Sequence, residues 1–242
     1  MIWHKKILAP VFSRLPAGVQ FELRRLNFAR QIRMVRFSSQ EPEMGLVADY
    51  LKGGDWAIDV GANVGHYTCS MAKYVGASGR VLAFEPVPTS FALLAANVRA
   101  SGMHNVTLFN LALSSEAAVS AMTIPRYTDS GVRNYYQARI SGEGDFPVLC
   151  LRLDAIPILG KVTLVKIDAE GHDLQVLIGM EGLLRKDRPV LIVEGSLSGS
   201  VAAWLGERGY RLRKTAGSPN IVAEPAEFQH DGLQETYAAA GH

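Results

Sequence analysis

The stretch Ile58-Asp-Val-Gly-Ala-Asn-Val-Gly-His-Tyr-Thr68 decides the fold. It begins within Trp56–Val60, an apolar run that predicts a buried parallel strand, and it leads into a helix expected from about Gly65 to Tyr74. Gly61 lets the chain turn sharply and leaves its backbone open to a ligand, and Gly65 lets the helix pack closely. The stretch therefore predicts a ligand-binding turn between a strand and a helix.

The spacing of this turn excludes two phosphate-binding motifs. A dinucleotide fingerprint needs glycine at positions 61, 63 and 66, where this chain has Gly61, Asn63 and His66. A Walker loop needs Gly-Lys-Ser or Gly-Lys-Thr, which does not occur in the sequence. The turn therefore suits a ligand without a pyrophosphate.

Strand and helix patterns alternate on the C-terminal side of this turn. Further strands are expected at Arg80–Phe84, Val106–Phe109, Thr163–Ile167 and Pro189–Val193. Helices are expected at Pro42–Leu51, Thr89–Ala100, Asp173–Gly179 and Ser200–Arg208. The alternation predicts an α/β fold, with a mostly parallel sheet and helices on both faces. With 242 residues, 48% of them hydrophobic, the chain is long enough for one sizeable core.

The region 114–150 departs from this alternation. Val119–Ile124 and Val148–Leu153 have the pattern of antiparallel strands. The polar loop between them contains Asp129, Ser130, Gly131, Gly142 and Gly144. A long, glycine-bearing insertion beside the carboxyl edge of a sheet is typical of a substrate lid, so we predict a lid at about 114–150 within a domain spanning 41–242.

Residues 1–40 form a basic helical extension in this interpretation, with the helix running to about Phe37. Eight basic residues stand against Glu22 alone, a balance of +7, so the remaining chain carries −5 for the total of +2. The basic residues are Lys5, Lys6, Arg14, Arg24, Arg25, Arg30, Arg33 and Arg36. One interpretation is a solvated helix whose apolar side chains face the body: Phe21, Leu26, Phe28, Ile32 and Val35. The others are contact with an anionic membrane surface, a nucleic acid or an acidic substrate, and packing on a second copy of the chain as a homo-oligomer.

Composition limits the compartment and the membrane topology. No apolar run reaches the roughly 20 residues that span a bilayer, and the N-terminus lacks a signal-peptide cleavage site. Cys69 and Cys150 form neither a disulfide framework nor a CxxC pair. We therefore expect a cytoplasmic protein without a transmembrane segment.

Two carboxylates are expected beside the glycine turn. Glu85, in Phe84-Glu85-Pro86, follows Asp59 by 26 residues and ends the next strand. A carboxylate at this place can accept two hydrogen bonds from a ribose diol, and ligands bind where such strand ends meet. Asn110-Leu-Ala112, at the end of the third strand, is expected where an adenine would lie. The pattern predicts a nucleoside pocket.

The segment Lys166-Ile-Asp168-Ala-Glu170-Gly171-His172 carries the candidate catalytic groups. Alternation along the strand places Lys166 and Asp168 on the same side. Asp168 and His172 are the expected proton acceptors for a hydroxyl nucleophile, with Glu170 behind them. The non-catalytic alternatives are that Asp168 caps a helix and that the His172 side chain faces solvent. A metal held by Asp168, Glu170 and His172 is a further alternative, but we expect no metal.

A further acid, Glu194, ends the strand Val190–Glu194 on the same rim. Acceptor binding or orientation of the base are the roles that this position favours. We therefore place Glu194 and Glu170 in the acceptor-binding site.

At these residues the sequence resembles the FkbM family of methyltransferases that use S-adenosylmethionine (SAM). The matching segments are Ile58–Thr68, Val81–Pro86, Asn110–Leu113, Val165–His172 and Val190–Glu194. The resemblance covers about residues 41–225 and implies a class I methyltransferase (Rossmann-like) fold. It implies a SAM site at Asp59, Gly61, Asn63, Gly65 and Glu85, with acceptor chemistry near Lys166–His172. Cofactor contacts are also expected from neighbours in the same segments: His66, Tyr67, Pro86, Asn110, Ala112 and Asp168.

The function expected from this resemblance is O-methylation of a small hydroxylated acceptor, a sugar or a natural product. N-methylation of an amine is an alternative, because an amine needs less help in losing its proton. A SAM- or nucleoside-binding module without catalysis is another. A nucleic-acid methyltransferase is disfavoured because the body is net acidic and lacks an aromatic-rich basic stripe.

Overall fold

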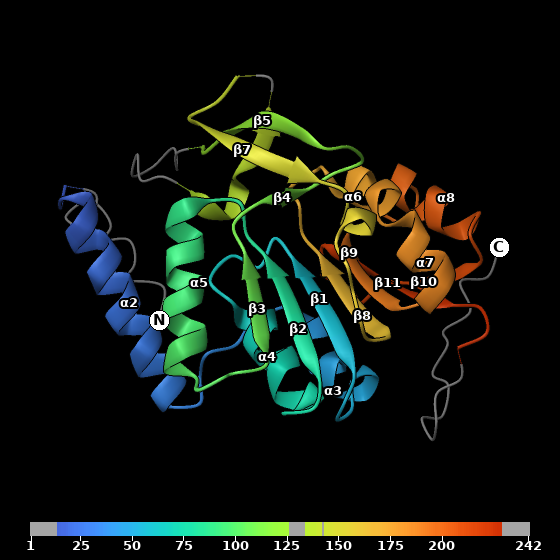
Figure 1. Ribbon diagram of the computed structural model, residues 1–242, viewed down its shortest axis with the longest axis horizontal. Helices are drawn as coiled ribbons and strands as arrows, with labels where there is room; N and C mark the ends of the chain where they lie inside the picture. Colours follow the sequence, from blue (N-terminus) through green and yellow to red (C-terminus); the bar gives the residue numbers. More distant parts are fainter. Residues whose placement is uncertain (1–13, 126–133, 142, 229–242) are drawn as a thin grey trace.

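A seven-stranded sheet lies at the centre of the computed structural model, which describes residues 14–125, 134–141 and 143–228 (Figure 1). The strand order is β10-β11-β9-β8-β1-β2-β3. The bounds are β1 Trp56–Val60, β2 Arg80–Phe84, β3 Val106–Phe109, β8 Val162–Ile167, β9 Val190–Glu194, β10 Tyr210–Arg213 and β11 Asn220–Pro225. The five strands from β9 to β3 are parallel, whereas β11 runs antiparallel to both β9 and β10.

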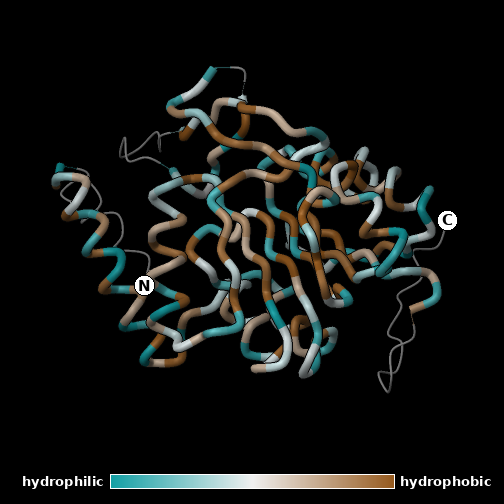
Figure 2. Tube along the Cα trace, viewed as in Figure 1, coloured by the Kyte–Doolittle hydropathy of each residue, from teal (hydrophilic) through white to brown (hydrophobic). Residues whose placement is uncertain are grey.

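Helices cover both faces of this sheet, as the sequence predicts. One face carries α3 (Val47–Tyr50), α4 (His66–Val75) and α5 (Pro88–Ala100). The other face carries α6 (Asp173–Gly179), α7 (Glu181–Asp187) and α8 (Ser200–Gly206). Alternation within the strands explains the two layers, because Ile58 packs with the α6–α8 side and Ala57 with the α3–α4 side. Figure 2 shows the apolar central strands between more polar surface segments.

The predicted elements of this sheet are confirmed within two residues at their ends. Expected Thr163–Ile167 and Pro189–Val193 correspond to β8 and β9, and Ser200–Arg208 corresponds to α8. Predicted Pro42–Leu51 is a 3-10 turn, η1 (Pro42–Leu46), that continues into α3. Within the described residues no helix is long and apolar enough to cross a membrane.

A second, four-stranded sheet in the order β4-β7-β5-β6 lies over the ends to which β1–β3 point (Figure 1). Its strands are β4 Ala112–Leu113, β5 Ala118–Thr123, β6 Arg139–Ser141 and β7 Phe146–Leu151. The predicted antiparallel pair is confirmed, since β5 pairs antiparallel with β7. A short 3-10 turn, η2 (Tyr135–Gln137), precedes β6, and another, η3 (Leu153–Ala155), follows β7. Of the loop residues that the sequence singles out, Asp129, Ser130, Gly131 and Gly142 lie outside the described residues.

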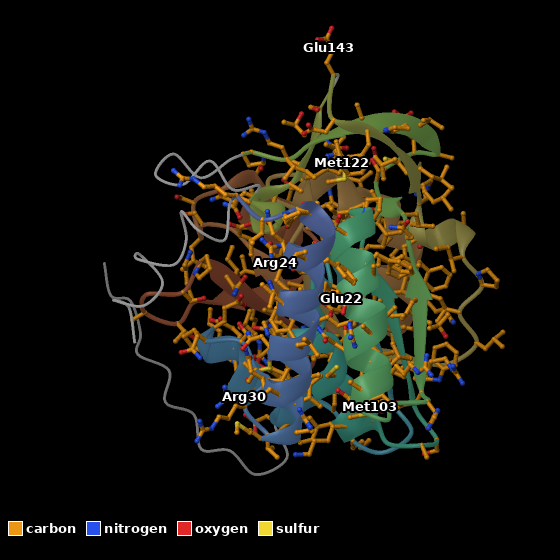
Figure 3. The ribbon with its side chains drawn as sticks, turned by 90° about the vertical axis from the view of Figure 1, so that its left-hand side faces the viewer. Glu22, Arg24, Arg30, Met103, Met122 and Glu143 are labelled. Atoms are coloured by element: carbon orange, nitrogen blue, oxygen red, sulfur yellow. The ribbon has the colours of Figure 1, made fainter. Side chains whose placement is uncertain are left out.

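The N-terminal helix α2 (Ala17–Arg33) packs against α5 at one side of the molecule (Figures 1 and 3). It ends four residues earlier than expected, because Met34 caps it and Val35 has a positive φ of 56°. Two of the side chains expected to face the body are instead exposed, Leu26 at 55% and Val35 at 90%. Leu26 lies on the side of the helix opposite Phe28, and Val35 follows the helix, so neither can reach α5.

Candidate active site

A cavity of about 450 Å³ lies at the carboxyl ends of β1, β2, β8 and β9. Its wall is completed by residues 38–41, which connect α2 to η1, and by side chains of the second sheet and the turn before β6. Carboxyl strand ends are where open parallel sheets bind ligands. The predicted turn after β1 therefore forms part of the wall of this cavity.

Gly61 brings the β1–α4 turn against the end of β8. It adopts a φ of +74°, and a Cβ built on it would lie 1.9 Å from the carbonyl oxygen of Asp168. Asp168 N–H in turn donates to the carbonyl of Val60 at 3.0 Å. The sequence interpretation, in which a missing side chain leaves room for a ligand, needs correction: the space is taken by the Asp168 backbone. The glycine thus couples two segments of the cavity wall.

Gly65 serves helix packing, as predicted. Its φ is +97°, and an added Cβ would lie 2.7 Å from Leu94 of α5. Gly65 does not line the cavity. Gly65, which the sequence placed in the cofactor site, can therefore act on that site only indirectly, by letting α4 pack close to α5.

Glu85 is buried at the end of β2 and lines the cavity. The Asn63 N–H donates to Oε2 at 2.7 Å, and the Val87 N–H donates to Oε1 at 2.8 Å. Burial raises the pKa of Glu85 to about 7, against the lowering effect of these backbone donors. Each carboxylate oxygen keeps capacity for a further donor, so the group can accept a diol.

Asn110 supports this glutamate from behind. Its side-chain amide donates to the carbonyls of Glu85 at 2.8 Å and Pro86 at 3.1 Å. Asn110 does not line the cavity, whereas Ala112 does. The amide therefore fixes the Glu85–Pro86 turn, and the expected direct cofactor contact by Asn110 has no counterpart in the cavity wall.

Asp59 is the second buried carboxylate of the wall, 2% exposed. It accepts a hydrogen bond from Thr68 Oγ1 of α4. Burial raises its pKa to about 6, while Thr68 and the Lys166 ammonium act in the opposite direction. Asp59 and Glu85 therefore line this end of the cavity with two carboxyl groups.

A buried polar network surrounds Lys166, which is 2% exposed. Its ammonium donates to Asn220 Oδ1 at 3.1 Å and lies 3.6 Å from Asp168 Oδ2 and 3.9 Å from Glu41 Oε2. Glu41 Oε2 also accepts from Tyr67 OH and Asn220 Nδ2, both at 2.9 Å. The predicted same-side placement of Lys166 and Asp168 is confirmed. Lys166 lies too deep to present its ammonium freely to a substrate, so its geometry suits positioning.

His66 and Tyr67, the first residues of α4, also line the cavity. The centroid of the His66 ring lies 4.4 Å from that of the Phe37 ring, and burial lowers the pKa of His66. Burial, reinforced by the charge of Glu41, raises the pKa of Tyr67, so its hydroxyl remains a donor. These two side chains tie the segment that follows α2 to the cavity wall.

Three carboxylates gather at the ends of β8 and β9. One oxygen from each of Asp168, Glu170 and Glu194 lies within 4.8 Å of the others. Burial raises the pKa of Glu170 to about 7, and the charges of Asp168 and Glu194 add to this effect. Burial likewise raises the pKa of Asp168 and Glu194. Carboxylates are ligands that Mg²⁺ accepts, so this set, rather than one containing His172, is the group that could hold a cation.

His172 precedes α6 and lines the same cavity. Its Nε2 lies 2.9 Å from Ser114 Oγ, and burial lowers its pKa, so the imidazole is neutral at pH 7. The alternative of a helix-capping Asp168 is not supported, because Asp173 accepts the Ala169 and Gly171 N–H groups of this turn. Both Asp168 and His172 remain available to the cavity.

The sequence reasoning missed two groups of wall residues. Glu41 and Asn220 come from segments without a recognised motif, and their polar partners lie far away along the chain. Met122, Tyr135, Ala138 and Ile140 bring apolar surface from the second sheet and the turn before β6. The polar Asn220 directly before the apolar run Ile221-Val-Ala223 was the available signal for the first group.

Comparisons with known proteins agree with this geometry. Residues 59–212 match the family model described as the methyltransferase FkbM domain. The hexuronic acid methyltransferase AglP of Haloferax volcanii is 27% identical over 191 residues, which are 77% of this chain and 74% of that protein. Methyltransferase 1 of Beauveria bassiana is 27% identical over 144 residues, 51% of this chain and 57% of that protein.

A solved structure shares the fold. The methyltransferase FkbM of Methylobacillus flagellatus KT superposes with a TM-score of 0.52 at 16% identity, over 70% of this chain. The matched part is 43% of that structure, so this chain spans less than half its length. The predicted class I, Rossmann-like fold is confirmed.

Proposed function

The chain belongs to the methyltransferase FkbM family, and from this premise we propose that it methylates a hydroxyl group of a sugar or of a small natural product, using SAM. The family and fold support SAM binding and methyl transfer as the general activity. The observation that carries the proposal is Asp168, held beside the buried Lys166 while its own side chain is 37% exposed. A fixed carboxylate open to a cavity is what deprotonation of a hydroxyl requires.

The residues of the cavity fit SAM. Glu85 suits the ribose diol, and the surrounding acids complement the positive charge of a sulfonium and an ammonium. Bound SAM supplies a methyl group activated by its positively charged sulfur. We assign contacts with it to wall residues that the sequence predicts: Asp59, Gly61, Asn63, His66, Tyr67, Glu85, Pro86, Ala112 and Asp168.

The acids and the imidazole at the β8 end serve the acceptor. As the acceptor oxygen bonds to the methyl carbon and the carbon–sulfur bond breaks, the hydroxyl proton passes to Asp168, with the electron pair remaining on sulfur. Lys166 keeps Asp168 ionised and oriented through their 3.6 Å contact. His172, neutral and in contact with Ser114, is the alternative proton acceptor.

The acceptor itself is placed between the β8–β9 rim and the second sheet. Glu170 and Glu194 can accept hydrogen bonds from further hydroxyls of a sugar. The acceptor class named for the relative AglP, a hexuronic acid, supports a sugar. An acceptor carboxylate close to Glu170 and Glu194 would meet like charge, so this chain favours a neutral hydroxylated ring there.

We assign the domain organisation accordingly. Residues 41–242 form the methyltransferase domain, with the second sheet as the substrate lid at about 114–150. Residues 1–40 form the extension, of which Ser38, Ser39 and Gln40 contribute to the cavity wall.

The test is methyl transfer from SAM carrying a labelled methyl group to a panel of neutral sugars and small hydroxylated compounds. Asp168→Asn should lower kcat by about 10²-fold or more when measured at saturating SAM, where a weakened contact between Asp168 and SAM does not affect kcat. Asp49→Asn, at an exposed position of α3, is the matched control and should leave kcat unchanged. A transfer rate that Asp168→Asn leaves intact would remove Asp168 as the base.

N-methylation is the second candidate, because the carboxylates of Glu170 and Glu194 would also bind an acceptor ammonium. The same variant separates the two reactions. An amine that loses its proton to solvent should tolerate Asp168→Asn with less than about a 10-fold loss in kcat. Locating the labelled methyl group on nitrogen or on oxygen by mass spectrometry decides between them.

A further inference from the structure

The exposed side of α2 carries apolar side chains that the fold does not use. Val19, Leu23 and Leu26 are 43%, 45% and 55% exposed, and Met34, just after the helix, is 49% exposed. Spacings of four, three and eight residues place Val19, Leu23, Leu26 and Met34 on one side, opposite the side of the helix that packs on α5. Figure 3 looks onto this helix, with α5 beside it.

Basic residues share this side of the helix. Arg30 and Arg33 are exposed and follow Leu26 on the same face. We use "the outer face of α2" for Val19, Leu23, Leu26, Arg30, Arg33 and Met34. Among residues 14–40, six arginines stand against Glu22 alone, which pairs with Arg25 at 2.8 Å. The segment is therefore strongly positive as well as apolar.

We propose that the outer face of α2 binds the surface of an anionic lipid bilayer, with the helix lying in the plane of the headgroups. The long arginine stems can extend past the exposed aliphatic side chains, so one side of the helix can meet both the apolar boundary and the anionic groups of a headgroup layer. The apolar side chains enter the headgroup boundary while the arginines meet anionic lipids. No spanning segment is needed for this attachment.

Charge distinguishes this occupant from two others. A second copy of the chain would bring together two segments that each carry six arginines against one glutamate, so like charge would meet across the interface. The preceding residues 1–13 include Lys5 and Lys6 and no acid, so covering the face with them would add like charge. An anionic surface satisfies both the arginines and the apolar side chains.

A nucleic acid would use the arginines but not the apolar groups. The phosphates of a nucleic-acid backbone attract positive charge, and the bases of single strands additionally stack on exposed aromatic rings. The outer face of α2 offers aliphatic groups in place of aromatic rings. An anionic lipid surface can interact favourably with both the arginines and the aliphatic side chains of this face.

The helix α2 that carries this face lies close to the catalytic cavity along the chain and in space. The Arg24 guanidinium lies 5.3 Å from the ring centre of Tyr135, which lines the cavity. Residues 38–41, which follow directly, form part of the cavity wall. Attachment through α2 would therefore hold the cavity near the bilayer.

The experiment is co-sedimentation of the full chain with two kinds of vesicle, phosphatidylcholine alone and two parts phosphatidylcholine to one part phosphatidylglycerol. We expect binding to the anionic vesicles, weakened by added salt, and little binding to the neutral ones. Arg30→Gln with Arg33→Gln should lower the partition coefficient by about fivefold for each arginine removed. Leu23→Gln with Leu26→Gln should lower it by about tenfold, because both apolar insertions are lost.

The control is Leu159→Gln with Lys186→Gln, which removes one exposed leucine and one exposed cation outside α2. It should bind as the unchanged chain does. Thermal unfolding midpoints within a few degrees of one another would show that each variant is folded.

Four results would overturn the proposal. Equal binding to neutral and anionic vesicles would remove the charge argument, and binding that survives both α2 variants would place the contact elsewhere. Self-association that is lost in Leu23→Gln with Leu26→Gln, without any vesicle binding, would assign the face to a second copy. Truncation of residues 2–13 should leave part of the binding; complete loss would assign the contact to those residues.

Discussion

Replacing Gly61 by alanine tests the link between the glycine turn and the end of β8. A Cβ at this position would lie 1.9 Å from the Asp168 carbonyl oxygen, and real Cβ contacts are essentially never shorter than 3.0 Å. The two segments must therefore separate by more than about 1 Å. Alanine must also adopt a φ of +74°, which L-residues avoid.

These two effects set the expected loss of stability. A left-handed conformation costs roughly 1–2 kcal/mol for a residue with a Cβ. Forcing apart a packed contact typically costs about 1–3 kcal/mol. Gly61→Ala should therefore lower the free energy of unfolding by about 2–5 kcal/mol, a large share of the 5–15 kcal/mol typical of a domain.

Gly102→Ala is the matched control. Gly102 has a φ of +67°, and nothing lies within 4 Å of the Cβ it would gain. It should lose only the conformational part, about 1–2 kcal/mol. Urea unfolding of both variants measures the difference. Equal losses in the two variants would refute the view that close approach to Asp168 is what requires glycine at position 61.

Three further predictions concern the cavity. Glu85 must be ionised to accept both hydroxyls of a diol, so the affinity of the unchanged protein for SAM should fall as the pH decreases below about 7. Glu85→Gln should remove this pH dependence and weaken SAM binding by about 10–100-fold. Calorimetry at several pH values measures both effects. In Glu41→Gln the new side chain can still accept hydrogen bonds from its neighbours, but the charge that raises the pKa of Asp168 is removed. The acid limb of the pH–kcat profile should therefore move to lower pH. An acid limb that stays in place would contradict this role of Glu41. Chelation with EDTA should leave kcat unchanged despite the proximity of Asp168, Glu170 and Glu194, whereas loss of activity restored by Mg²⁺ would make this cluster a metal site.

The parallel core of the fold was predictable from local sequence. Trp56–Val60 and Arg80–Phe84 are short apolar runs between turn signals, and the structure reproduces both strands with the same bounds. The acids Asp59, Glu85 and Glu194 at the carboxyl ends of strands all line the cavity, because strand direction determines where those side chains gather. Local patterns therefore suffice where the strand itself positions the group.

The rest depended on contacts between distant segments. In β11, Asn220 and Glu224 are buried, a pattern that does not indicate a central strand; pairing with β9 and β10 places it there. Glu41 reaches Asn220 across 179 positions of the chain. The exposure of Leu26 likewise depends on which side of α2 meets α5. No local periodicity specifies such partners.

We assign SAM to the cavity between Asp59, Glu85 and the β8 end. Titration calorimetry of the purified chain with S-adenosylhomocysteine, the demethylated product, measures this binding. We predict one molecule bound per chain, with affinity reduced by about 100-fold or more when Asp59→Asn and Glu85→Gln are combined. Absence of heat with both the product and SAM itself, or an affinity that the double substitution leaves intact, would contradict the account.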